Sequence, residues 1–272
     1  MIKYDFHMHS INSLDGQQSV DDACRAAIEK GLTGIAITDH ADICFFEKDD
    51  TITRFKKLID DIKSAKVKYN GQLEIYTGIE MAEYLTNPVG AESTLALTDY
   101  DVVLGSIHTV YFDGIDDSYS RIDFSKMPKE KIVAFIDLYF DKMLEMISKT
   151  DFDILTHLTC PLRYINGKYG RGIDIWIYEA KIKQILKEII ERGISLEINT
   201  SGYATDNAYF MPERDVLTLY YDMGGRRVSV GSDAHASKNV AIGFDEAEKT
   251  LTDIGFDGYY VYKERKPIFI RF

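Results

Sequence analysis

The stretch KYDFHMHSINSLDG, residues 3–16, places His7 and His9 directly after a short run that we predict to be a strand. Side chains two residues apart on a strand point to the same face of the sheet. The whole chain of 272 residues contains only six histidines. Two of them side by side on one face of the first strand therefore indicate a site rather than chance.

Along the rest of the chain, short apolar runs alternate with longer segments of helical periodicity. The predicted strands are residues 2–6, 33–38, 73–79, 101–107, 153–156, 194–198 and 227–232. The predicted helices are residues 19–31, 53–71, 127–149, 173–193 and 211–225. This alternation predicts an α/β protein with a parallel sheet and helical crossovers. Seven such units favour one closed, TIM-barrel-like domain over residues 1–272 rather than an open doubly wound sheet.

Residues 258–272, GYYVYKERKPIFIRF, differ from the rest of the chain. They form two short β segments separated by charged residues. We expect this stretch either to close the bottom of the barrel or to form an interface.

All six histidines follow predicted strands, at the carboxyl end of each. Two acidic residues share this placement, and the full set is His7, His9, His40, Glu80, His108, His157, Asp233 and His235. In a (β/α) barrel the carboxyl ends of the strands form one face, where active sites are built. One histidine after a strand is more often a hydrogen-bonded structural residue, but six such placements together predict a shared metal site.

Imidazole and carboxylate ligands together suit zinc, manganese or iron. Six imidazoles are too many for one ion that keeps an open position for water, so we expect two or three divalent ions. Two neighbouring ions are able to clamp a phosphoryl group. Glu80 is the only glutamate at the end of a predicted strand, and we expect it to bridge two ions.

The formal net charge of -12 argues against nucleic acid or an anionic membrane as a partner. It leaves room for a small phosphorylated metabolite, because bound divalent ions reverse the local potential. There is no apolar run long enough to span a bilayer and no secretory pattern at the start of the chain. The three cysteines are widely spaced, and their odd number leaves at least one thiol without a partner. We therefore expect a cytoplasmic protein with reduced thiols.

The ordered motifs of this chain resemble those of the PHP (polymerase and histidinol phosphatase) superfamily. They are HMHSINSLDG (7–16), ITDHAD (37–42), GIE (78–80), GSIH (105–108), THL (156–158) and GSDAH (231–235). Each motif alone is weak, whereas the ordered set is specific and covers nearly the whole chain. The resemblance implies a distorted (β/α)7 barrel with a trinuclear metal centre. A stand-alone chain of this length is most similar to the histidinol-phosphate phosphatases of histidine biosynthesis.

The resemblance also implies three sets of ligands, one for each ion: His7, His9, Glu80 and Asp233; Glu80, His108 and His157; and Asp15, His40 and His235. Asp15 departs from relatives that carry histidine at this position, and a carboxylate hardens the site. Asp39 is expected to orient a histidine rather than to bind metal.

The implied reaction is hydrolysis of L-histidinol phosphate by a metal-bound hydroxide, with Glu80, Asp233 and His235 as catalytic residues. Arg163 is the candidate for binding the substrate phosphate, because its guanidinium matches phosphate oxygens bidentately; a structural role as a helix cap or surface ion pair is equally compatible with the sequence. Asn199 and Ser201 are either hydrogen-bond donors at the rim or ordinary turn residues. Candidates for the histidinol end are Glu83, Tyr84, Tyr111 and Phe112, among which the sequence does not select.

Other functions stay open at this point. A phosphotyrosine-protein phosphatase would need a more open pocket, and a nucleotide phosphatase or exonuclease would need a basic track, against which the net charge counts. A metal-storage protein would have closed four-ligand sites. A metal-dependent amidohydrolase also uses His-x-His after the first strand, but it usually carries a lysine at a strand end, and none of the predicted strands here ends in lysine.

Overall fold

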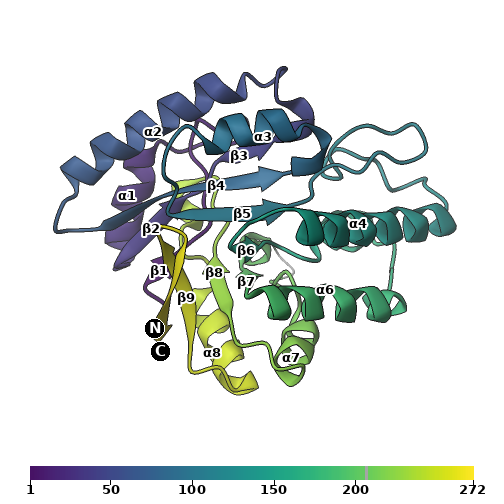
Figure 1. The fold of residues 1–272 in the computed structure, drawn as a ribbon. Helices are drawn as coiled ribbons and strands as arrows, with labels where there is room; N and C mark the ends of the chain where they lie inside the picture. The colour runs from purple at the N-terminus through teal and green to yellow at the C-terminus, as the bar shows by residue number, and fades with distance from the viewer. Residues whose placement is uncertain (206–207) are drawn as a thin grey trace.

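Parallel strands form a nearly closed barrel (Figure 1). The computed structural model describes residues 1–205 and 208–272. Within them, the seven strands in order around the barrel are β1 (Tyr4–Asp5), β2 (Gly34–Ile37), β4 (Glu74–Ala82), β5 (Val102–Ser106), β6 (Ile154–Leu155), β7 (Ser195–Asn199) and β8 (Val228–Gly231). Each overlaps a predicted strand, and the distorted (β/α)7 barrel expected from the sequence is confirmed.

The first and last strands meet through backbone contacts around the start of the chain. Phe6 N donates to Val230 O at 3.1 Å, and Asp233 N donates to His7 O at 2.7 Å. An isolated parallel bridge joins Met8 to Ala234 just beyond the ends of β1 and β8. The barrel is therefore closed irregularly at the point where the His7–His9 segment lies beside the Asp233–His235 segment.

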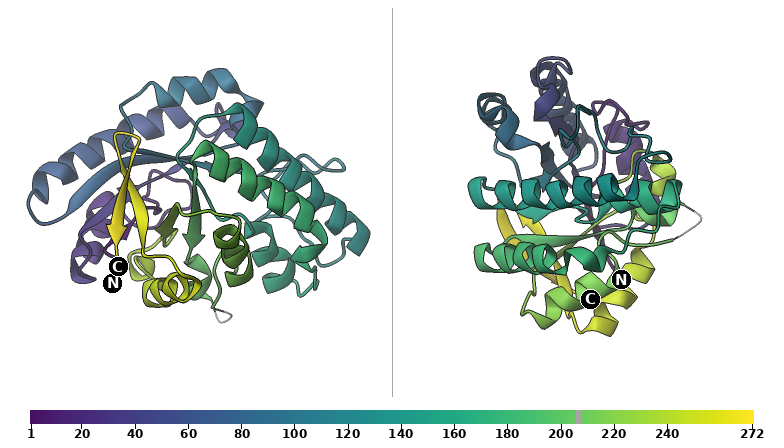
Figure 2. Two further views of the ribbon diagram at one scale, coloured as in Figure 1. Left: turned by 60° about the horizontal axis from the view of Figure 1, so that its bottom comes forward. Right: turned by 90° about the vertical axis from the view of Figure 1, so that its right-hand side faces the viewer.

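Helices surround the sheet (Figure 2). The longer ones are α1 (Val20–Glu29), α2 (Thr51–Lys68), α3 (Pro88–Leu95), α4 (Lys129–Lys149), α6 (Glu179–Arg192), α7 (Arg214–Asp222) and α8 (Phe244–Ile254). The shorter ones are α5 (Cys160–Leu162), η1 (Ile43–Phe45), η2 (Tyr84–Thr86), η3 (Arg163–Lys168), η4 (Ile175–Tyr178), η5 (Ser201–Ala204) and η6 (Ser237–Asn239). Within the described residues, no helix has the length and apolar character that crossing a bilayer requires.

Local sequence signals set the helix ends. Ser19 caps α1 by accepting a hydrogen bond from Asp22 N, and the Asp22 side chain accepts from Ser19 N in return. This reciprocal capping box satisfies two backbone donors that the first turn of a helix leaves free. Gly193 ends α6. Its backbone is in the left-handed conformation, with φ of 68°, which a glycine adopts without strain.

The strands are buried on both faces, because helices cover the outside and side chains fill the inside. Every residue of β2, β5, β7 and β8 is buried. Such strands read as continuous apolar runs rather than alternating ones, as expected for a parallel sheet. Polar residues inside these strands are therefore exceptional, and they point to the site described below.

The antiparallel hairpin of β9 (Gly258–Lys263) and β10 (Lys266–Arg271) covers the amino ends of the strands. Tyr259 Oη accepts from Lys3 N at 2.9 Å, just before β1. Tyr262 Oη lies 2.7 Å from Ser195 Oγ at the start of β7. The hairpin thus closes the bottom of the barrel, which was one of the two roles expected for residues 258–272, and leaves the opposite end open for a site.

Candidate metal centre

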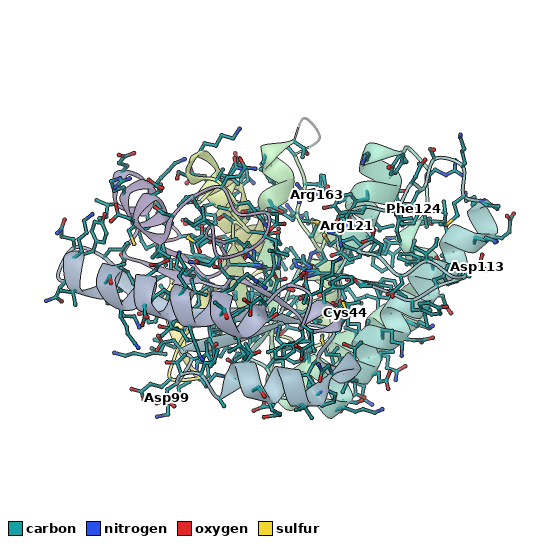
Figure 3. All side chains as sticks on the ribbon, turned by 90° about the horizontal axis from the view of Figure 1, so that it is seen from above. Cys44, Asp99, Asp113, Arg121, Phe124 and Arg163 are labelled. Carbon is teal, nitrogen blue, oxygen red and sulfur yellow. The ribbon has the colours of Figure 1, made fainter. Side chains whose placement is uncertain are left out.

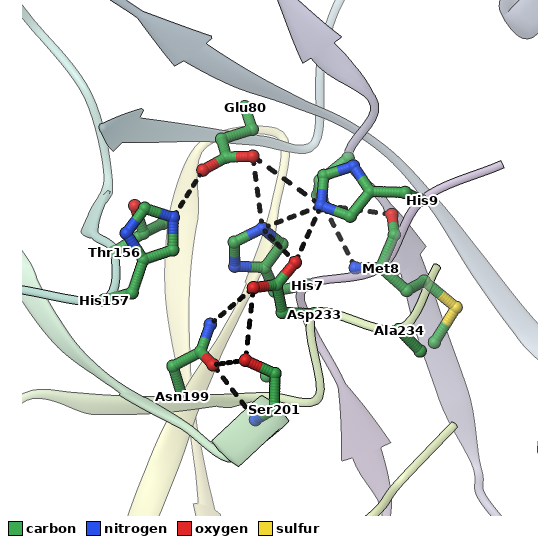
Figure 4. Close-up of polar contacts among 12 residues, drawn as sticks. His7, Met8, His9, Glu80, Thr156, His157, Asn199, Ser201, Asp233 and Ala234 are labelled. Carbon is green, nitrogen blue, oxygen red and sulfur yellow. Dashed lines mark hydrogen bonds and ion pairs between the residues drawn. The ribbon is translucent and has the colours of Figure 1, made fainter. Parts of the chain in front are cut away.

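The six histidines meet Glu80 and Asp233 at the carboxyl ends of the strands. Figure 4 shows three of them, His7, His9 and His157, around these two carboxylates. Four groups of three residues bring their ligand atoms within 4.8 Å of one another: His7, His9 and Asp233; His7, Glu80 and His157; His40, Glu80 and His108; and His9, His40 and His235. The groups share members, so they form one continuous cluster of donors. The parallel topology explains the convergence, because residues far apart in sequence follow neighbouring strands.

Glu80 lies at the centre of this cluster. Its Oε1 lies 2.8 Å from His157 Nε2 and 3.1 Å from His108 Nε2. Its Oε2 lies 2.7 Å from His40 Nδ1 and 3.4 Å from His7 Nε2. Each carboxylate oxygen therefore faces a different pair of imidazoles, which is the arrangement of a bridging ligand. Glu80 lies within β4 rather than at its end, since β4 continues to Ala82 by pairing with the short strand β3 (His40–Asp42).

Asp233 faces the histidines that follow β1. Its Oδ1 lies 3.1 Å from His9 Nε2 and 3.8 Å from His7 Nε2. Its Oδ2 accepts at 3.4 Å from both Asn199 Nδ2 and Ser201 Oγ. The backbone of Asp233 has φ of 50°, in the left-handed region that aspartate enters more readily than most residues with a side chain.

Asp15 lies at the outer edge of the cluster and is 62% exposed. Its carboxylate oxygens lie 3.3 Å from His235 Nε2 and 3.7 Å from His40 Nε2. The same two Nε2 atoms lie 3.3 Å from each other. Asp15 therefore stands where the resemblance implied it, beside His40 and His235, but it reaches them from the solvent side.

Two carboxylates that orient histidines were not predicted from the sequence. Asp42 Oδ1 lies 2.8 Å from His108 Nδ1, and Glu197 Oε1 lies 2.6 Å from His7 Nδ1. Both have a signal in the sequence: Asp42 lies two residues after His40 on one strand face, and Glu197 is a charged residue inside the otherwise apolar run ISLEI. Such carboxylates fix the tautomer and the ring orientation of a ligand histidine.

Asp39 acts differently from the expectation that it orients a histidine. Its two oxygens accept from Ser10 N and Ser10 Oγ, each at 2.6 Å. It therefore fixes the loop after β1. In the same loop, Ser13 Oγ lies 3.3 Å from His9 Nδ1 and accepts from His40 N at 3.0 Å.

The donor set fits divalent ions. The Asp233 carbonyl oxygen only accepts, so His235 Nδ1, 2.9 Å away, carries a proton and leaves a lone pair on Nε2 of the neutral ring. The same reasoning with Asp42 leaves a lone pair on His108 Nε2, which faces the Glu80 carboxylate. Oxygen and nitrogen acceptors that face one another in a buried site need either a proton or a metal ion between them.

The charges within the cluster keep its carboxylates ionised and raise the pKa values of most of its histidines. Neighbouring carboxylates raise the pKa of His7, His40, His108 and His235 above the usual value, against the effect of burial. Burial alone would raise the pKa of Glu80, but His108, His40 and His7 hold it well below its usual value. Burial, together with His40 and His235, lowers the pKa of His9 well below its usual value. A metal ligand must be an ionised carboxylate or a neutral imidazole, so an ion that binds here would take the place of protons on the histidines whose pKa is raised.

A cavity of about 620 Å³ opens above the cluster. Its lining includes His40, His108, His157, Asp233 and His235, with Asp15, Asp42, Phe45, Asp49, Tyr119, Arg121, Arg163, Tyr164 and Ser201 on the walls and rim. Arg163 and Arg121 lie toward the middle of the molecule when it is seen from above, whereas Asp113 lies at its periphery (Figure 3). Arg163 Nη1 donates to Ser201 Oγ at 3.0 Å.

The residues considered for a histidinol moiety lie elsewhere. Glu83 is buried and accepts from Thr109 N at 2.8 Å and from His108 N. Tyr84 donates to Glu92, Tyr111 is 68% exposed, and Phe112 packs on Phe135. The walls of the cavity instead carry Phe45, Tyr119 and Tyr164, on segments where the sequence showed no periodic signal.

The fold and the donor cluster define a (β/α)7-barrel protein with a candidate multinuclear metal centre. Comparison with known proteins gives the family: the model of the PHP domain matches residues 5–201. The chain therefore belongs to the PHP domain family, as the motifs indicated. The matched range ends before Asp233 and His235, so their place in the site rests on the geometry described above.

Similar proteins extend over nearly the whole chain. A probable histidinol-phosphatase of Clostridium acetobutylicum is 30% identical over 90% of this chain and 91% of its own length. A probable histidinol-phosphatase of Thermotoga maritima is 26% identical over 93% of this chain and 93% of its own length. The crystal structure of the histidinol phosphate phosphatase of Lactococcus lactis, complexed with zinc, L-histidinol and phosphate, superposes with a TM-score of 0.78 over 98% of both chains at 20% identity. At this identity, the structural likeness shows the fold.

Proposed function

We propose that this chain is a metal-dependent phosphomonoesterase that hydrolyses L-histidinol phosphate to L-histidinol and phosphate, with residues 1–272 forming one catalytic domain. The observation that carries the proposal is the cluster of six histidines with Glu80 and Asp233. Four of these histidines and Asp233 line the cavity, and Arg163 lines it too. The names of the similar proteins and the chemistry of the cavity agree on this substrate.

The cluster would hold two or three divalent ions, of zinc, manganese or iron. Glu80 would be shared between ions, because its two oxygens face different histidines. Asp233 would complete the group of His7 and His9, and Asp15 would complete the group of His40 and His235. When bound, such ions supply Lewis acidity and lower the pKa of water to near neutral.

Arg163 would bind the substrate phosphate. Its bond to Ser201 Oγ uses one of the five N–H donors of a guanidinium and fixes the direction of the side chain. Ser201 is held in turn by Asn199 Oδ1, to which its Oγ donates at 2.7 Å. The guanidinium therefore stands in a preset orientation beside the cluster, which lowers the entropy cost of binding a phosphate.

The upper part of the cavity fits the leaving group. Histidinol carries an ammonium and an imidazole, and Asp42 and Asp49 line the cavity together with the aromatic rings of Tyr119 and Tyr164. His235 commits Nδ1 to the Asp233 carbonyl, and its Nε2 faces His40. We therefore assign His235 to ion binding, and a water molecule of the cavity supplies the proton to the departing alcohol.

The alternatives make different demands on the site. An amidohydrolase usually places a lysine at a strand end, whereas the lysine among the described residues of this cavity is Lys48, between η1 and α2 and remote from any strand end. A storage site would be closed over its ions, whereas this cluster opens into a cavity. Neither feature favours a function other than phosphate-ester hydrolysis.

The test is a phosphate-release screen with metal-depleted protein reconstituted separately with zinc, manganese or iron. The substrates are L-histidinol phosphate, a phosphotyrosine peptide and nucleoside monophosphates, compared by kcat/KM. We expect L-histidinol phosphate to lead by at least about tenfold, or roughly 1.4 kcal/mol in transition-state binding. A preference for the peptide or for the nucleotides would replace the proposed substrate, and no release with any metal would refute the phosphatase.

A further inference from the structure

Glu197 lies behind the donor cluster, in β7, and is 1% exposed. Its carboxylate has three partners. Oε1 lies 2.6 Å from His7 Nδ1, and Oε2 accepts from the backbone N of His157 at 2.8 Å and from Asn199 Nδ2 at 3.1 Å. One buried side chain thus joins the segment after β1 to the segment after β6. We propose that Glu197 is the positioning residue that assembles His7 and His157 as a ligand pair around Glu80.

The bond to His7 fixes the tautomer of that ring. A carboxylate only accepts, so in the neutral His7 ring that a metal ion requires, Nδ1 carries the proton and Nε2 keeps its lone pair. That Nε2 atom lies 3.4 Å from Glu80 Oε2 and 3.1 Å from His9 Nε2. The nitrogen that faces the cluster is therefore the one that is free to bind metal.

The bond to His157 holds a strained backbone. His157 has φ of 24°, a value that a residue with a side chain rarely adopts. Among the described residues, no hydrogen-bond partner orients its ring through Nδ1, so the ring direction depends on the backbone. Glu197 accepts the N–H of this residue, and the resulting placement brings His157 Nε2 to 2.8 Å from Glu80 Oε1.

The surrounding chain leaves room for this carboxylate. A Cβ at Gly231, in β8, would lie 2.5 Å from Glu197 Oε1 and 2.4 Å from His7 Cβ. Both distances are below any normal contact, so a larger residue at Gly231 would displace the pair. The absence of a side chain at Gly231 is what allows Glu197 and His7 to meet.

An amide cannot replace the carboxylate. The donors at Oε2, from His157 and Asn199, require an oxygen at that position, so Glu197→Gln would place its NH2 group toward His7 Nδ1. That group donates, which moves the proton of His7 to Nε2 and blocks the ligand atom. The substitution therefore keeps the size of the side chain while reversing the tautomer that metal binding needs.

The experiment measures Zn²⁺ affinity of Glu197→Gln by competition with a chromophoric chelator. We expect a loss of about tenfold to a hundredfold, as is usual for carboxylates that hold ligand histidines. The control is Asp153→Asn, which alters a buried carboxylate at the opposite end of β6 that accepts from Val103 N at 2.8 Å. This control is expected to bind Zn²⁺ like the wild type, although it lowers thermal stability.

A second readout separates positioning from general destabilisation. In zinc-loaded protein with ¹⁵N-labelled histidine, the Nδ1–H of His7 should give a downfield proton signal that Glu197→Gln removes and Asp153→Asn keeps. If Glu197→Gln fails to fold, Glu197→Asp takes its place, since it keeps the charge but retracts the oxygens from His7. Wild-type affinity together with an unchanged His7 signal in the folded variant would overturn the inference.

The inference rests on the proposed function only in that both need metal at this cluster, and neither readout uses a phosphorylated substrate. If the wild type binds Zn²⁺ but releases no phosphate, the proposed function fails and the role of Glu197 is still decided by affinity. If the wild type binds no Zn²⁺, the inference fails, while the proposed function is still decided by phosphate release with manganese or iron.

Discussion

His40 and Glu80 are Cα partners in the parallel β3–β4 pair, and His40 Nδ1 lies 2.7 Å from Glu80 Oε2. The register of a three-residue strand thus sets the separation of two donors at the centre of the site. In the same pair, Ala41 lies opposite Met81 and points to the other face, as the two-residue period of a strand requires. A slip by one residue would turn both donors away from the cluster.

Glu80→Gln should reduce turnover by orders of magnitude while the protein stays folded. The substitution removes the charge that Oε1 and Oε2 present to different histidines, and an amide nitrogen cannot replace a ligand oxygen. Steady-state kinetics with L-histidinol phosphate and circular dichroism measure the two effects. Glu74→Gln is the matched control, because Glu74 is exposed at the other end of the same strand. Near-normal turnover of Glu80→Gln would show that the ions are bridged elsewhere.

Gently purified protein should contain two or three divalent ions per chain, and their removal should lower the melting temperature. Ions that bind only the native state stabilise it by about 4 kcal/mol when their concentration is a thousand times the dissociation constant. The checks are elemental analysis and thermal unfolding before and after chelation, followed by refilling with zinc or manganese. Less than one ion per chain in fully active protein would contradict the metal centre.

Arg163→Ala should raise KM for the phosphate ester and leave the melting temperature close to that of the wild type. A charge-assisted contact to phosphate contributes about 1.5–3 kcal/mol, or roughly tenfold to a hundredfold in affinity. Arg171→Ala is the comparison, since Arg171 donates to Ser125 O at 2.9 Å and Met127 O at 2.8 Å, away from the cluster. We expect that variant to lose stability and to keep KM. The reverse pattern would make Arg163 a structural residue.

The sequence predicted the parts of the fold that have a local signal. The seven barrel strands and the helices α1, α2, α4, α6 and α7 follow from apolar runs and helix caps, such as Ser19 before α1 and Gly193 after α6. The helix α3 escaped prediction because its eight residues, PVGAESTL, lack an apolar period and include Gly90. The helix α8 was also left out, although Phe244, Ala247 and Leu251 recur at helical spacing along it.

The sequence also predicted only part of the site. The donors could be found because histidines are few and each follows a strand, whereas the partners of the donors depend on three-dimensional contacts. Glu197 meets His7 across 190 positions of the chain, and the sequence does not encode that distance locally. The resemblance to a known family supplied Asp15, which no spacing argument would have singled out.

Hydrolysis should proceed by a single displacement and invert the configuration at phosphorus. Burial raises the pKa of the Cys160 thiol to about 11, so this cavity residue is not a thiolate at neutral pH. Ser201 Oγ donates to Asn199 Oδ1 rather than to an imidazole base. Neither side chain is activated as a nucleophile, so we expect water to attack phosphorus in one step. The measurement is turnover of an isotopically chiral phosphate ester in labelled water. Net retention, or a phosphorylated side chain trapped by rapid quenching, would require two displacements and refute this pathway, while the metal centre would still stand.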